Sequence, residues 1–123
     1  MKLTLLATLM VLLCSCKTTI SKNIIGTWES SSDNTVITLT FDENKSCLID
    51  TSYGTNVNIK TENEWRVDKN IIILKNTKVI ANNKLQKSNP SISELTIIKI
   101  DNKSLIVKTP ESKEHVKFNK TNL

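Results

Sequence analysis

The chain has 123 residues, a net charge of +5, 38% hydrophobic residues and 24% charged residues, which suits one globular domain and is too short for two. Two glycines and two prolines are too few for a collagen-like or a proline-rich disordered protein. The abundance of isoleucine, threonine and asparagine, with little alanine, favours strands joined by turns over a helical bundle.

The first fifteen residues have the organisation of a signal peptide. Lys2 precedes an apolar run over residues 3–13. A helix of that length spans roughly 16 Å, far less than the ~30 Å of a bilayer core. The run is therefore typical of the hydrophobic region of a secretory signal, and we expect residues 1–15 to be removed.

The segment that follows is Leu13-Cys14-Ser15-Cys16. It resembles the lipobox of bacterial lipoproteins, in which a small residue precedes a modified cysteine. The resemblance implies that the Cys16 thiol accepts a diacylglyceryl group and that the protein carries fatty-acyl chains such as palmitate. The alternative is a secretory signal that is either uncleaved or cleaved without lipid attachment.

The lipobox also predicts the domain plan and the location. We expect residues 16–23 to be the lipidated cysteine with a short tether, and residues 24–120 to be the folded domain. The resemblance, with Lys17 after the cysteine, indicates lipid anchoring in the cell envelope, at the outer membrane of a Gram-negative bacterium. Cys47 is then the one cysteine of the domain, so no internal disulfide is expected, and it is interpreted as a small buried hydrophobe.

From residue 24 onward the chain shows short alternating segments separated by turn residues, which is the pattern of an antiparallel all-β domain. The clearest alternation lies in residues 56–68, where Val57, Ile59, Trp65 and Val67 share one face. We expect eight strands, at residues 24–30, 35–41, 46–53, 56–68, 71–75, 93–100, 104–109 and 114–119. Residues 76–92 are the longest segment without a clear strand pattern, although 79–81 could extend a strand.

The connections between these segments are too short for parallel crossovers. An up-and-down meander is therefore expected, and closing it into a small antiparallel β-barrel of about eight strands removes its exposed edges. Gly26-Thr27-Trp28, at the start of the first strand, resembles the lipocalin and calycin signature. Together with the lipobox, the chain is similar to the lipocalin-like domains of bacterial lipoproteins over residues 22–120. That resemblance implies structural roles for Gly26 and for a buried Trp28.

The inward positions of the expected strands predict what would line the barrel. They are strongly apolar, so any ligand should be apolar or amphipathic. The candidate lining residues are Ile37, Leu39, Ile49, Val57, Ile59, Trp65, Val107 and Phe118, with Cys47, Leu105 and Val116 at the same parity.

No constellation in the sequence defines a reaction, so we expect a protein without catalytic residues, metal or cofactor. His115 alternates with Val116 and is expected to face solvent. Glu62 and Glu64 share the wet face of their strand with Lys60 and Arg66 and are interpreted as surface charge. Nucleic-acid binding is not expected, because the basic segment from Lys75 to Lys87 has no aromatic residues for base stacking. That segment is interpreted as a solvated basic loop, with an anion-facing surface as the alternative.

Two functions remain open at this point, with an envelope enzyme as a much weaker third. The first is a lipid-anchored binding module that captures a small apolar ligand or peptide in the barrel or its mouth. The second is an envelope interaction protein of the same fold with a filled core and no ligand. A cavity large enough for a ligand separates the two. Neither the oligomeric state nor the partner follows from the sequence.

Overall fold

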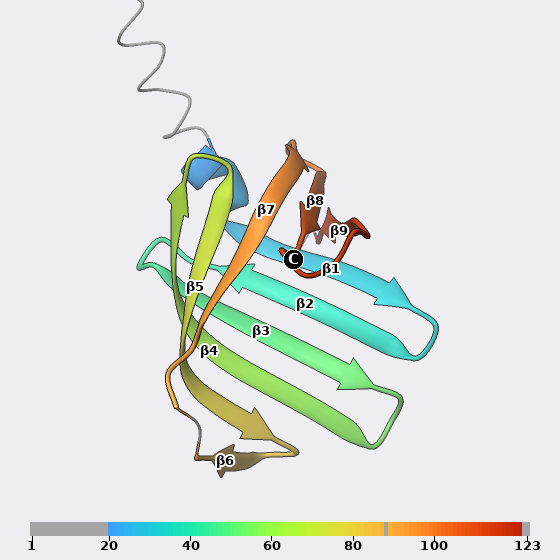
Figure 1. Ribbon diagram of the computed structural model, residues 1–123. Helices are drawn as coiled ribbons and strands as arrows, with labels where there is room; N and C mark the ends of the chain where they lie inside the picture. The colour runs from blue at the N-terminus through green and yellow to red at the C-terminus, as the bar shows by residue number, and fades with distance from the viewer. Residues whose placement is uncertain (1–19, 88, 122–123) are drawn as a thin grey trace, which may run out of the picture.

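The computed structural model describes residues 20–87 and 89–121, so the predicted signal peptide and Cys16 lie outside the described residues. Nine strands follow one another along the described chain (Figure 1). Their bounds are β1 Gly26–Ser32, β2 Thr35–Phe41, β3 Ser46–Tyr53, β4 Val57–Asp68, β5 Ile71–Ala81, β6 Lys84–Gln86, β7 Ile92–Ile100, β8 Ser104–Lys108 and β9 Val116–Lys120.

Eight of these strands close into an antiparallel barrel. Each strand from β1 to β5 pairs with the next, β5 pairs with β7, and β7, β8 and β9 continue the meander. β9 then returns to β1, where Trp28 lies opposite Lys120 and Glu29 opposite Asn119. The short β6 folds back on the last residues of β5 and stays outside the ring. The expected all-β up-and-down barrel is thus confirmed.

Alternation along the strands places one set of side chains inside this ring. Leu39 on β2 lies between Trp28 on β1 and Ile49 on β3, so all three side chains point inward. Inward-facing and outward-facing side chains alternate in the same way along β4 and β8. The buried core that results consists of Ile24, Trp28, Leu39, Phe41, Cys47, Trp65, Ile72, Leu74, Ile97, Leu105, Val107 and Phe118.

Two bulges shift the parity of β5 and β7. In β5 the register moves from Glu62 opposite Lys78 to Asn63 opposite Asn76, so Thr77 is the extra residue. In β7 a similar shift occurs between Ile97 and Lys99. A bulge interrupts alternation. For this reason the sequence analysis did not assign residues 76–86 as strand, although they contain the rest of β5 and β6.

One end of the barrel is covered by a short helix at residues 20–24. Ile24 is fully buried, and Ile20 packs against the core. The indole Nε1 of Trp28 donates a 2.8 Å hydrogen bond to the carbonyl oxygen of Ile24. The helix therefore occupies part of the segment expected to be tether. In the described part of the chain, no helix is long and apolar enough to cross a membrane.

Gly26 and Lys120 complete this closed end. Gly26 has a φ of +133°, and a Cβ there would lie 2.8 Å from Cε of Lys120. The missing side chain lets Lys120 cross over β1, and its Nζ lies 5.2 Å from the centroid of the Trp28 ring. Such a cation above an aromatic face adds a favourable electrostatic contact.

We predict that Trp28→Ala lowers the free energy of unfolding by about 3–5 kcal/mol, because it removes a fully buried ring and its hydrogen bond. The measurement is urea unfolding of residues 17–123, a fragment that contains every described strand and the helix. Tyr53→Ala is the control, since Tyr53 is 48% exposed. A Trp28 variant as stable as the Tyr53 variant would contradict this account of the closed end.

Candidate functional site

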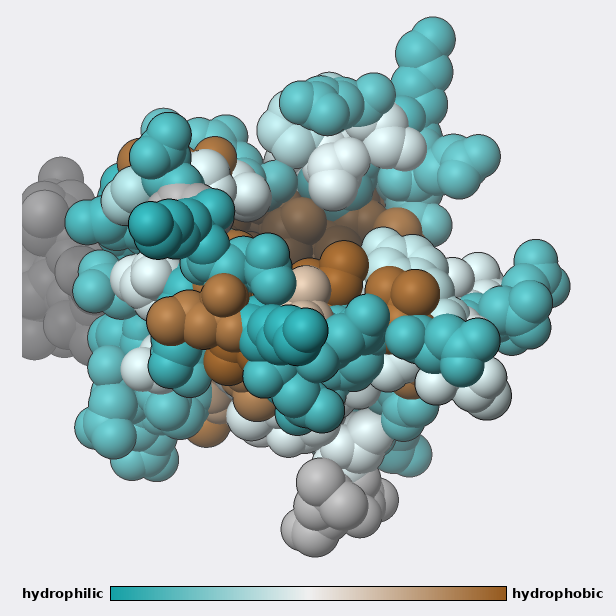
Figure 2. All heavy atoms as spheres, turned by 90° about the horizontal axis from the view of Figure 1, so that it is seen from below, coloured by the Kyte–Doolittle hydropathy of each residue, from teal (hydrophilic) through white to brown (hydrophobic). Residues whose placement is uncertain are grey.

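The half of the barrel farthest from the helix contains a cavity of about 700 Å³. Figure 2, which views the molecule from that side, shows a hollow with hydrophobic residues at its base and hydrophilic residues around it. The lining comes from β2, β3, β4, β5, β7, β8, β9 and the segment between β8 and β9. It consists of Ile37, Leu39, Ile49, Thr51, Thr61, Asn63, Leu74, Asn76, Ile92, Ser93, Glu94, Leu95, Val107, Thr109, Pro110, Glu111, Val116 and Phe118.

The base of the cavity is the surface of the hydrophobic core that faces away from the helix. Leu39, Leu74, Val107 and Phe118 belong both to the buried core and to the cavity lining. Their burial comes from contacts with the closed half of the barrel, so the base is held rigidly by the same packing that stabilises the fold. An apolar molecule seated here would remove further apolar surface from water.

One wall of the cavity is polar. Thr51 on β3, Thr61 and Asn63 on β4, Asn76 on β5 and Ser93 on β7 all line it, and Asn63 lies directly opposite Asn76. The remaining strands β2, β8 and β9 supply isoleucine, leucine, valine and phenylalanine, apart from Thr109 beyond the end of β8. The cavity is therefore two-sided, with hydrogen-bonding groups on one side and hydrocarbon on the other.

Asn63 is the one buried polar residue of the core region, with 6% of its surface exposed. Its side-chain Nδ2 donates to the carbonyl oxygens of Cys47 and Thr61 at 3.3 and 3.2 Å, and it lies 3.2 Å from Thr61 Oγ1. These contacts hold the amide plane against the wall. Asn63 is thus a fixed polar group at the edge of the apolar base.

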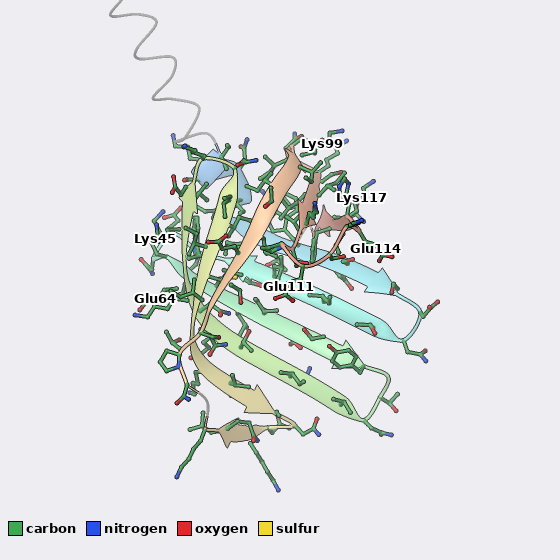
Figure 3. The ribbon with its side chains drawn as sticks, viewed as in Figure 1. Lys45, Glu64, Lys99, Glu111, Glu114 and Lys117 are labelled. Atoms are coloured by element: carbon green, nitrogen blue, oxygen red, sulfur yellow. The ribbon has the colours of Figure 1, made fainter. Side chains whose placement is uncertain are left out.

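The mouth of the cavity is lined by the start of β7 and the segment that joins β8 to β9. Ile92 is 69% exposed there and Val116 is 37% exposed, so both leave apolar surface in water at the rim. Glu94 and Glu111 line the same region. Figure 3 shows Glu111 nearer to the barrel opening than Glu114 of the same segment.

Five of the eight predicted lining residues lie in the wall of this cavity, namely Ile37, Leu39, Ile49, Val107 and Phe118. Trp65 does not line it. It is 2% exposed, packs edge-on against Phe41 with ring centroids 5.4 Å apart, and donates from Nε1 to the carbonyl of Asp42. A ring of that size fills the closed half of the barrel, so inward parity alone does not make a cavity residue.

Val57 and Ile59 also fall outside the lining, although they share the parity of Trp65. Val57 begins β4 and is 41% exposed. Ile59 lies opposite Thr51 and Ala81, near the free ends of β3 and β5. This corner of the sheet extends past the cavity towards β6. The expectation that these two residues line the cavity is therefore wrong.

Sequence reasoning missed the polar wall and the mouth. The alternation of β4 contained the signal for Thr61 and Asn63, because both share the inward parity of Trp65. Asn76 continues the inward parity of Ile72 and Leu74, but it was missed because the expected strand ended at residue 75. Glu111 lies between strands, where alternation predicts nothing.

The remaining chemically notable residues lie away from the cavity. His115 is exposed. Lys75 and Lys78 lie on the outer face of β5, opposite Glu64 and Glu62. Among the residues that the structure describes, no three His, Cys, Asp or Glu side chains are grouped so as to hold a metal ion.

Cys47 is buried in the core at 1% exposure. Burial, together with the smaller effect of the neighbouring Asp42 carboxylate, raises the pKa of its thiol from 9.0 to about 12. A thiol with so high a pKa carries almost no thiolate at neutral pH and is a poor nucleophile. Cys47 thus contributes packing.

Comparison with known proteins supports the fold and leaves function open. No protein-family model and no protein of curated function matches this sequence. Among solved structures, a lipocalin-like protein from Bacteroides thetaiotaomicron superposes with a TM-score of 0.51 and 15% identity, covering 80% of this chain and 97% of that protein. The chain has a lipocalin-like fold. At this identity the likeness shows the fold alone, so the lipobox and the role of the Gly-x-Trp segment stay predictions.

We predict that the stability of the domain falls as pH rises from about 9 towards 12. The folded state keeps the Cys47 proton that the unfolded chain loses above pH 9, so stability is fully present below that pH and is lost above it. Urea unfolding of fragment 17–123 at about pH 8 and about pH 11 measures the change. Cys47→Ala should show a smaller loss, which separates this thiol from the lysines and Tyr53; an equal loss in both proteins would refute the assignment.

Proposed function

We propose that this protein binds one small amphipathic molecule in the open half of its barrel. The observation that carries the proposal is the cavity of about 700 Å³ with an apolar base and a single polar wall. Small-molecule sites typically enclose about 300–1,000 Å³ and combine a mostly apolar lining with a few oriented polar groups. The alternative of a filled barrel that acts only through its outer surface accounts less well for this space.

We also propose that the domain is anchored through lipid on Cys16 to the cell envelope, at the outer membrane. Three residues separate Cys16 from the helix that begins at Ile20. Even fully extended, that distance is about 14 Å. Because the helix covers the closed end of the barrel, such an anchor would hold the closed end near the membrane and leave the cavity mouth facing away from it. In this arrangement a ligand enters from the aqueous side.

The first test is binding of an uncharged apolar dye such as Nile red to fragment 17–123. We expect saturable fluorescence enhancement with a stoichiometry near one. Ile49→Trp should abolish it, because the larger ring projects from β3 into the cavity. Leu48→Trp is the matched control: Leu48 is the next residue, lies on the outer face and is 39% exposed.

The two variants separate cavity binding from surface adsorption. Loss of the signal in Ile49→Trp with retention in Leu48→Trp supports the proposal, provided that both variants show the unfolding transition of the parent fragment. An unchanged signal in the folded Ile49→Trp variant would place the dye elsewhere. Absence of saturable binding in the parent fragment would reject the cavity as a binding site.

The anchor has a separate test. Mass spectrometry of the mature protein extracted from membranes of its host should find Cys16 as an acylated N-terminus. Cys16→Ala should move the protein from the membrane fraction to the aqueous fraction or stop its processing, because lipid chains supply the membrane affinity. An unmodified Cys16 in membrane-extracted protein would remove the basis for the anchor and leave the binding proposal intact.

A further inference from the structure

The charge around the cavity has the opposite sign to the charge of the molecule. The chain has 17 Lys and Arg residues against 12 Asp and Glu residues. The described residues that line the cavity include Glu94 and Glu111 and no lysine, arginine or histidine. Glu94 lies opposite Ile73, while its neighbours Ser93 and Leu95 lie opposite the core residues Leu74 and Ile72. The Glu94 side chain is therefore on the outer face of β7, and Glu111 is the carboxylate at the mouth. A ligand that enters this mouth therefore meets negative charge, although the protein as a whole is positive.

The polar wall presents a hydrogen-bond acceptor that has no donor from the described protein residues. Asn63 uses its Nδ2 on Cys47 and Thr61, and no donor among residues 20–87 and 89–121 lies within hydrogen-bond distance of its Oδ1. No side-chain nitrogen or oxygen sealed from solvent lacks a partner in the same residues, so this oxygen is open to the cavity that Asn63 lines. The group is an acceptor, held in place, without a protein partner.

These two observations disfavour a carboxylate ligand. A carboxylate brings only acceptors to Asn63 Oδ1. It would also lose its hydration shell near Glu111 with no cation in the described lining to compensate it, which is costly. An amine supplies N–H donors to the oxygen, and its protonated form is attracted by the Glu111 carboxylate.

We propose that the natural ligand is a cationic amphiphile, an amine on an apolar body, and that the site discriminates against fatty acids. This inference rests on the proposed binding function and specifies its ligand class. The apolar body packs on the base formed by Leu39, Leu74 and Phe118. The amine lies along the polar wall within reach of Asn63 Oδ1, and Glu111 places negative charge at the mouth.

The test compares three probes with ten carbon atoms each: decylammonium, decanol and decanoate. The displacement of Nile red from fragment 17–123 by each probe is measured at neutral pH and low salt, below the micelle concentration of the probe. We expect decylammonium to bind at least about tenfold more tightly than decanoate, with decanol between them. The preference should shrink at high salt, because mobile ions screen the carboxylate at the mouth.

The three probes keep this inference apart from the binding proposal. If decanoate binds as tightly as decylammonium, the ligand class is wrong while the cavity still binds an amphiphile. If neither probe nor decanol displaces the dye from the cavity, the binding proposal falls with it. An amine preference that survives high salt unchanged would also overturn the assignment to Glu111.

Variants locate the source of the preference. Glu111→Gln should remove most of the difference between decylammonium and decanoate and leave decanol affinity unchanged. Glu114→Gln is the control, since Glu114 lies in the same segment but does not line the cavity. Full preference in the Glu111 variant, or equal loss in the control, would contradict the proposal.

The contact with Asn63 is tested by changing the ligand, because substitution of Asn63 could unfold the domain. Decanol should bind several-fold more tightly than nonyl methyl ether of matched length, since the ether has no hydrogen to donate to Oδ1. Equal affinities would show that this oxygen does not contact the ligand head group.

Discussion

The burial of Trp28 is the interaction on which the rest of the barrel depends. Its ring joins three parts of the chain: the helix through Ile24, β2 through Leu39 and, from the far end of the domain sequence, β9 through Lys120. The barrel closes only where β9 meets β1, and this happens beside the same ring. A backbone hydrogen bond from Thr121 to Thr27 extends the junction. The packing around Trp28 therefore both closes the sheet and seals one end of the barrel.

The uneven placement of aromatic rings explains why the other half of the barrel is hollow. An eight-stranded barrel is just wide enough for side chains to fill, and filling it takes large residues. Trp28, Phe41 and Trp65 all lie in the closed half, and Tyr53 is largely exposed. The open half has Phe118 at its base and otherwise medium or small residues such as Ile37 and Thr61. Space remains where the chain supplies no ring.

The sequence allowed the architecture to be predicted because alternation and turn residues are local signals. Clean period-two patterns in β2 and β4 identified strands, and short connections left an antiparallel meander as the economical solution. Depth along the barrel is not local, so Trp65 and Ile49 had the same parity but lie in different halves. Bulges break the period itself, and the extra residue Thr77 hid the continuation of β5 beyond Asn76. The mouth depends on segments between strands, for which no period exists.

The polar wall of the cavity lowers the stability of the barrel, and ligand binding provides a reason for that cost. Placing Asn63 beside Leu74 and Trp65 costs desolvation that hydrogen bonds to Cys47 and Thr61 only partly offset, because one oxygen stays without a protein donor. A leucine there would suit a barrel whose only requirement was a stable core. Stability is commonly sacrificed where a site must present polar groups to a ligand. The cost at Asn63 is therefore easier to understand in a barrel that binds than in one that is merely filled.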